Sequence, residues 1–203
     1  NERSCLAAMI PAGVVCGNKV PTIAFPNDPV EERLWLWIAL VNALPFDWMM
    51  RRVITTTINY FHLLSLPLPP IEPDSLPGRQ LVGIAKRLDG LDRSGGSRDV
   101  HWQIAELRAK ADQLVLNAYG LTAADLDLMM EDFPLVDRTQ PPLDGEEKST
   151  ITRDLIVAHS RLKASSSAAR ARVNSAVSLG ALPYMPSQMA LAGEPQSMRE
   201  AHG

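Results

Sequence analysis

The chain has 203 residues, which is enough for one medium-sized domain or for a domain with an appended arm. Its hydrophobic share of 46% and charged share of 21% are typical of a globular protein. The net charge of −3 excludes a broadly basic nucleic-acid-binding surface, so any contact with DNA would come from a local patch.

The first 25 residues predict a small β-sheet. They contain short apolar stretches at residues 6–10, 13–16 and 22–25, separated by Pro, Gly and Asn residues that favour turns. Short apolar stretches bounded in this way are typical of strands. The chain would then start inside a core element without a lead-in, so we expect it to be a piece of a larger protein.

Helices are predicted for most of the remaining chain. Asp28 and Pro29 fit the cap and the first position of a helix. Residues 34–44 of this helix are apolar on every side, which predicts a central position. Pro45 should end it, and a second helix should follow over about residues 46–54. Further helices are expected over residues 77–88, from residue 100 to Gly120, after a capping box of Thr122 and Asp125, and over about residues 149–162.

The predicted fold class is therefore α+β, mainly helical with a small N-terminal β-sheet. The proline-rich stretch at residues 66–70 must be extended, and it separates residues 1–72 from a helical region at residues 77–162. Residues 163–203 begin with small and basic side chains and then lose periodicity, which predicts a loosely ordered basic arm.

The cysteines and the longest apolar run bear on cellular location. Two cysteines do not make a disulfide framework, so we expect Cys5 and Cys16 to be reduced and buried in a cytoplasmic protein. Residues 34–44 are too few to span a bilayer, which needs about 20 residues. No membrane partner is therefore expected.

No pattern in the chain predicts a catalytic centre. There is no Gly-rich phosphate loop and no nucleophile elbow, and the four histidines lack metal-ligand spacing. Glu146–Lys148 resembles the metal-binding end of some nucleases, but it follows Pro141–Pro142 and precedes a helix, which favours a solvated loop. Neither Pro-Pro pair, at 69–70 or 141–142, has the polar and aromatic neighbours that amino-methylating DNA methyltransferases use. We expect no catalytic residue, metal or cofactor in this chain.

Residues 51–61 are the strongest candidate for binding nucleic acid. They combine two arginines, three threonines, Asn59 and two aromatic residues. Arginine contacts guanine or phosphate, asparagine reads adenine, and threonine contacts phosphate or a thymine methyl group. The same residues also fit a helix C-terminus followed by a β-branched extended segment. On these residues alone, the purely structural interpretation is the stronger one.

Five groups of segments occur in an order that resembles one family. They are Glu2–Arg3 with Leu6–Pro11 and Gly13–Asn18, Leu40–Asn42 with Phe46–Asp47 and Arg51, Thr57–Phe61 with Leu66–Pro69, Ala109–Asp125, and Phe133–Arg138. This order resembles the C-terminal target-recognition region of large adenine-N6 DNA methyltransferases. These include type IIG-like restriction–modification enzymes and the BREX- and DISARM-type phage-defence enzymes. Ser4, Ala43 and Thr56–Thr57 depart from the family's pattern and put the base preference in doubt.

The resemblance implies a DNA target-recognition and scaffold fragment without the catalytic half, which would precede residue 1 and bind S-adenosylmethionine. Residues 1–72 would belong to the recognition domain, and residues 77–162 would brace it against the missing half. The implied partners are double-stranded DNA, the missing half and other defence proteins. The residues expected to face DNA are Arg51, Arg52, Thr55, Thr57 and Asn59, with Arg3, Asn18 and Lys19 as further phosphate contacts.

Two other functions remain open. A helical protein–protein interaction module of a defence complex would use the long helix from Val100 and the acidic residues 131–160, and it fits the net charge better. A nuclease built on Glu146–Lys148 is the less favoured alternative.

Overall fold

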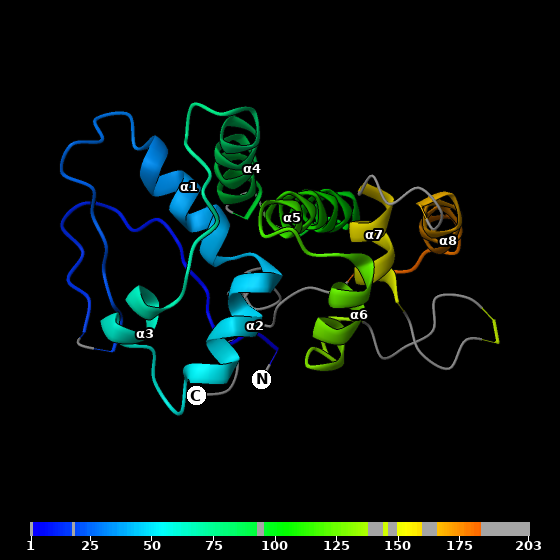
Figure 1. Ribbon diagram of the computed structural model, residues 1–203. Coiled ribbons are helices and arrows are strands. Elements are labelled where there is room, and N and C mark those ends of the chain that lie inside the picture. The colour runs from blue at the N-terminus through cyan, green and yellow to red at the C-terminus, as the bar shows by residue number, and fades with distance from the viewer. Residues whose placement is uncertain are drawn as a thin grey trace, which may run out of the picture.

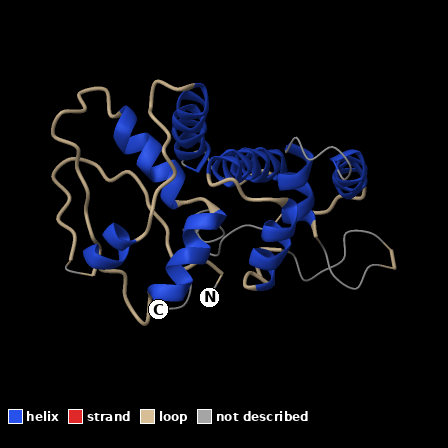
Figure 2. Ribbon diagram, viewed as in Figure 1, coloured by secondary structure: helices blue, strands red, loops and turns tan. Residues whose placement is uncertain are grey.

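The computed structural model describes residues 2–17, 19–92, 96–137, 144–145, 150–159 and 166–183. The regular secondary structure of these ranges is helical throughout, as Figures 1 and 2 show. The helices are α1 (Glu32–Val41), α2 (Leu44–Val53), α3 (Tyr60–Ser65), α4 (Leu76–Asp92), α5 (Arg98–Ala118), α6 (Ala123–Glu131), α7 (Ile151–His159) and α8 (Ser166–Ser178).

The predicted N-terminal β-sheet is not present in the described part of the chain, so the α+β fold class is wrong and the described fold is all-helical. The three apolar stretches do not pair with one another. Polar groups of the segment instead contact side chains from the helices. The backbone of Ala7 bonds to the side chain of Asn42, and the backbone of Thr22 bonds to the hydroxyl of Tyr60. Short apolar stretches bounded by turn-forming residues indicate an extended chain, but they do not show whether a partner strand is available.

Helix α1 begins later than predicted, at Glu32, yet Asp28 caps it as expected. The carboxylate of Asp28 accepts the backbone N–H groups of residues 32, 33 and 34 at 3.1, 2.8 and 3.1 Å. Glu31 adopts a left-handed conformation, with φ of 59°, at the turn between Asp28 and the helix. Asp28 therefore satisfies three of the N–H groups that the first turn of a helix leaves unpaired.

A break between two helices is present as predicted, but it falls at Asn42–Ala43 rather than at Pro45, which lies in the first turn of the second helix. Helix α1 ends at Val41, and α2 has Pro45 near its start, where a missing N–H costs nothing. The predicted helices over the later chain are also present. The capping box of Thr122 and Asp125 begins α6 as expected, and Gly120 ends α5 with φ of 72°.

Helix α5 lies between α1 and α4 on one side and α6, α7 and α8 on the other (Figure 1), and it contributes to two buried clusters. One face of α5 contributes Trp102 and Leu116 to a cluster with α6, α7 and α8. The other face contributes Val115 to a cluster with α1 and α4. One buried cluster therefore contains side chains from both expected domains, residues 1–72 and residues 77–162. Helix α1 belongs to the first range, and α4 belongs to the second.

A third, smaller cluster joins the N-terminal segment to α1 and α2. It contains Cys5, Val41, Phe46 and Met50, all 3% exposed or less. Cys5 is free and buried as expected, whereas Cys16 is free but only half-buried. This cluster brings the N-terminal segment against α1 and against α2, which carries the predicted Arg51 and Arg52.

Part of the expected C-terminal arm has regular structure. Helix α8 packs Ala169, Val173 and Ala176 against the cluster that α7 belongs to. The remaining arm residues 163–165 and 184–203 lie outside the described residues. None of the described helices has the length and apolarity needed to cross a membrane.

Candidate functional site at the N-terminal junction

Asp47 on α2 anchors the N-terminal segment. Its carboxylate is fully buried and pairs with the guanidinium of Arg3, whose side chain is 11% exposed. The same carboxylate accepts the backbone N–H groups of Ser4 and Cys5 at 2.9 and 3.1 Å. Arg3 was expected to contact phosphate. The structure instead assigns it to a buried ion pair that ties the segment to α2.

Asn42, at the C-terminal end of α1, holds the next part of the segment. Its side-chain oxygen accepts the N–H of Ala7 at 2.9 Å, and its side-chain nitrogen donates to the carbonyl of Ala7 at 2.7 Å. This pair of bonds satisfies both polar groups of Ala7, as a neighbouring strand would. Arg3 also donates to the backbone carbonyl of Asn42 at 2.6 Å, so the two anchors are linked.

Arg51 joins the last turn of α2 to two distant parts of the chain. Its guanidinium donates to the carbonyl of Glu2 at 2.8 Å and to the carbonyl of Asp132 at 3.0 Å. It also lies over the ring of Phe133, with its central carbon 4.1 Å from the ring centroid. Arg51 is half-buried by these contacts, so it stabilises the junction between α2, the N-terminus and the end of α6.

Arg52 is the more accessible of the two arginines, with 51% of its side chain exposed. It pairs with the carboxylate of Asp132 and stacks 4.6 Å from the ring centroid of Trp48. The indole N–H of Trp48 donates to the same carboxylate at 2.7 Å. Hydrogen bonding from Arg52 lowers the pKa of Asp132, and the bond from Trp48 adds to this effect. Arg52 thus presents a paired but solvent-facing guanidinium.

The other predicted DNA-facing residues lie on loops. Thr55 and Asn59 are exposed and Thr57 is half-buried in the connection between α2 and α3. The backbone N–H of Asn59 donates to Nδ1 of His62, which helps to begin α3. Lys19 is exposed on the N-terminal segment, and Asn18 and Glu146–Lys148 lie outside the described residues.

Sequence reasoning assigned no role to the acids that hold this junction. Asp47 and Asp132 pair with the predicted arginines, and Asp112 on α5 accepts the N–H of Leu44 at 2.7 Å, which caps α2. One sequence signal was available for Asp112. It lies next to Ala111 in a helix whose apolar positions recur every three or four residues, so it falls beside the buried face.

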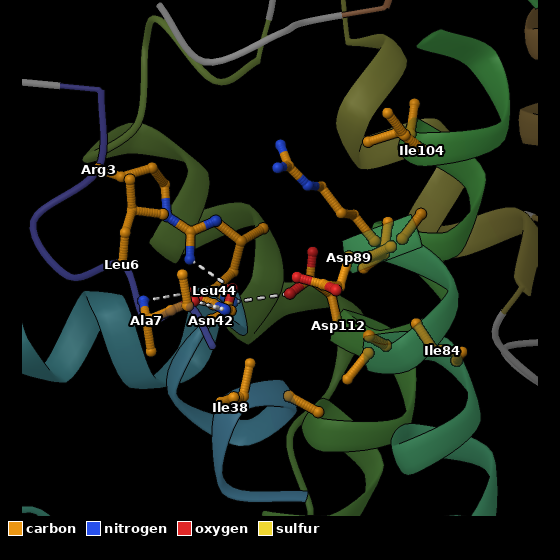
Figure 3. Close-up of a pocket in the computed structure, with 18 of the residues that line it drawn as sticks. Arg3, Leu6, Ala7, Ile38, Asn42, Leu44, Ile84, Asp89, Ile104 and Asp112 are labelled. Atoms are coloured by element: carbon orange, nitrogen blue, oxygen red, sulfur yellow. Dashed lines mark hydrogen bonds between the residues drawn. The ribbon is translucent and has the colours of Figure 1, made fainter. Parts of the chain in front are cut away.

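A cavity of about 280 Å³ opens beside these anchors (Figure 3). It is bounded by the N-terminal segment, α1, α4 and α5, and residues of α2 and α7 complete its wall. Its wall is mostly apolar but includes Arg3, Asp89, Arg108 and Asp112. No group of His, Cys, Asp and Glu that could hold a metal ion occurs in the part of the chain that the structure describes.

The pKa of Asp112 is raised from 3.8 to about 6, mainly by burial. Arg3, Arg108 and the hydrogen bond from Leu44 oppose this shift, and the charge of Asp47 adds to it. The folded protein therefore binds a proton at Asp112 more tightly than the unfolded chain does.

Replacing Asp112 with asparagine should make stability less dependent on pH. The side-chain oxygen of asparagine still accepts the N–H of Leu44, but it carries no charge. Because the folded-state pKa is raised, the stability that the proton provides is present at low pH and is lost as the pH rises through about 6. Between pH 5 and pH 7.5, the free energy of unfolding of the wild type should fall by about 1–2 kcal/mol relative to that of Asp112→Asn. This range follows because one pKa unit corresponds to about 1.4 kcal/mol. Urea unfolding of both proteins at several pH values measures this, and parallel curves would contradict it.

Compared with known proteins, the chain matches no family model, no curated protein and no solved structure.

Proposed function

We propose that this chain is the DNA target-recognition and scaffold fragment of an adenine-N6 DNA methyltransferase from a restriction–modification or phage-defence system. The observation that carries the proposal is the contact between segments that carry the resemblance. Glu2–Arg3 contacts both Asp47 and Arg51, and Arg51 also contacts Phe133. These positions come from three separate groups of segments, so the residues that resemble the family also form one structural junction.

The scaffold part of the proposal is supported by how the arginines are used. Arg3 and Arg51 connect the N-terminal segment, α2 and the end of α6, and they leave little guanidinium surface for a ligand. The residues left to face DNA are Arg52, Thr55, Asn59 and Lys19, all exposed. In this proposal, the junction positions a small exposed patch on the recognition side of the intact enzyme.

The cofactor and the chemistry belong to the missing half in this proposal. The chain has no Gly-rich loop of the kind that lets a backbone approach a nucleotide closely. In this proposal S-adenosylmethionine therefore binds to the other half of the enzyme. The fragment would contribute DNA contacts and rigidity, and the partner half would flip and methylate the adenine.

Fluorescence anisotropy with a random-sequence duplex tests the proposal. Weak binding that falls steeply between about 50 and 200 mM salt is expected, because phosphate contacts release counterions. Arg52→Ala should weaken binding to all sequences and reduce the salt slope by about 1, as loss of one phosphate contact does. Arg87→Ala, on the exposed surface of α4, is the matched control and should bind as the wild type does. If Arg52→Ala and Arg87→Ala bind the duplex equally well, Arg52 does not contact DNA.

A protein-interaction module is the second candidate, and one observation favours it. Large apolar side chains are exposed on the N-terminal segment and on α3. Val15 is 94% exposed, Leu64 is 79% exposed and Phe61 is 65% exposed. Large exposed apolar side chains of this kind favour contact with another polypeptide. Two results together would favour this function. The chain would not bind DNA even at low salt, and it would bind the catalytic half of a parent enzyme with an affinity that does not depend on salt.

A further inference from the structure

The cavity beside the N-terminal junction has the features of a small ligand site. Its volume of about 280 Å³ is close to the lower end of the range for ligand pockets, about 300 Å³. Leu6, Ile38, Ile84 and Ile104 bring apolar surface to it from four different elements. Such a wall fits the body of a compact apolar molecule.

Asp112 gives this cavity a polar group that the fold does not fully use. The residue is 5% exposed. One carboxylate oxygen accepts the N–H of Leu44. The other oxygen accepts no hydrogen bond from any residue that the structure describes, and the residue lines the cavity (Figure 3). Buried carboxylate oxygens normally accept a hydrogen bond, so we expect a donor in the cavity to bind this oxygen.

The carboxylate of Asp112 favours a cation. Two carboxylates, Asp89 and Asp112, line the cavity with two guanidinium groups, Arg3 and Arg108, and Arg3 is engaged in its ion pair with Asp47. An anion would meet the Asp112 carboxylate at close range, and a neutral hydrocarbon would leave its second oxygen unpaired.

We propose that this cavity binds a compact monocation, an amidinium or primary ammonium group on an apolar body, with the cation donating to Asp112. The apolar body would occupy the space between the N-terminal segment and the helices. This site does not depend on the proposed DNA-related function, because it uses none of the exposed residues assigned to DNA.

Benzamidine is a suitable probe, because it carries an amidinium on a compact ring. Ligand-observed NMR and calorimetry with the full chain should show saturable binding of benzamidine. Benzamide has nearly the same shape but no positive charge to pair with the Asp112 carboxylate, so it should bind about ten-fold more weakly or worse, a difference of at least about 1.4 kcal/mol. Benzoate should not bind. Equal binding of all three compounds, or no saturable binding of benzamidine, would overturn the proposal.

Two variants and one control variant locate the binding. Asp112→Asn keeps an acceptor for Leu44 and removes the charge, so benzamidine should then bind no better than benzamide. Asp125→Asn changes a capping acid on α6 that does not line the cavity, and it should leave benzamidine binding unchanged. Ala105→Leu places a larger side chain in the cavity wall and should abolish binding of both compounds. Because Ala105→Leu leaves Asp112 intact, it tests the location even if Asp112→Asn does not fold, and unaltered binding to Ala105→Leu would refute it.

Discussion

Replacing Asp47 with alanine should lower the free energy of unfolding by about 3–5 kcal/mol, the usual cost of breaking a buried ion pair. Asp47 is completely buried and accepts hydrogen bonds from Arg3, Ser4 and Cys5. Without it, the Arg3 guanidinium is left nearly buried and without its carboxylate. Two backbone N–H groups also lose their acceptor. Urea unfolding followed by circular dichroism measures the loss.

An exposed ion pair provides the control for Asp47→Ala. Asp127, which is 50% exposed, pairs with Arg153 on the surface, and Asp127→Ala should cost less than about 1 kcal/mol. The double variant Arg3→Ala with Asp47→Ala should lose less stability than the sum of the two single variants, because the residues share one interaction. A loss from Asp47→Ala as small as that from Asp127→Ala would show that the anchor contributes little.

Replacing Phe133 with alanine should cost about 3–5 kcal/mol, as for other buried phenylalanines. The side chain is 1% exposed and packs in the cluster with α5, α6 and α7. Its ring also supports the guanidinium of Arg51. The substitution therefore leaves a cavity in the core and removes the surface against which Arg51 is held. Thermal and urea unfolding both measure the effect.

Phe61 is the matched control for Phe133. It is 65% exposed on α3, and Phe61→Ala should change stability by less than about 0.5 kcal/mol. Arg51→Met separates the cation from the packing of its side chain. A double-mutant cycle with Phe133→Ala should give a coupling of about 0.5–2 kcal/mol. Zero coupling would mean that the guanidinium and the ring do not stabilise each other.

The helices could be predicted from the sequence because their signals are local. Apolar spacing over residues 100–118 and the capping box of Thr122 with Asp125 each involve neighbours within a few turns. The N-terminal sheet could not be judged in the same way. A strand exists only if another strand pairs with it, and here the available partners are side chains such as Asn42 and Tyr60.

The contacts of the candidate arginines could not be predicted from the sequence, for a related reason. Arg51 and Arg52 were predicted to face DNA, but a guanidinium suits an internal carbonyl or carboxylate as well as a phosphate. What distinguishes these roles is the position of Asp132, which is 80 residues from Arg52 along the chain. Asp47 is likewise 44 residues from Arg3. No local pattern contains that information.

The two buried faces of α5 have a consequence for how the molecule unfolds. Val115 supports the cluster with α1 and α4, and Leu116, the next residue, supports the cluster with α6, α7 and α8. Because both clusters contain side chains of α5, unfolding of α5 would disrupt both at once. The two clusters should therefore unfold as a single cooperative unit. A chain cut between residues 72 and 77 would separate α1 from α4 and leave neither piece with a complete interior. The smallest independently folding unit therefore extends from the N-terminal segment through at least α7.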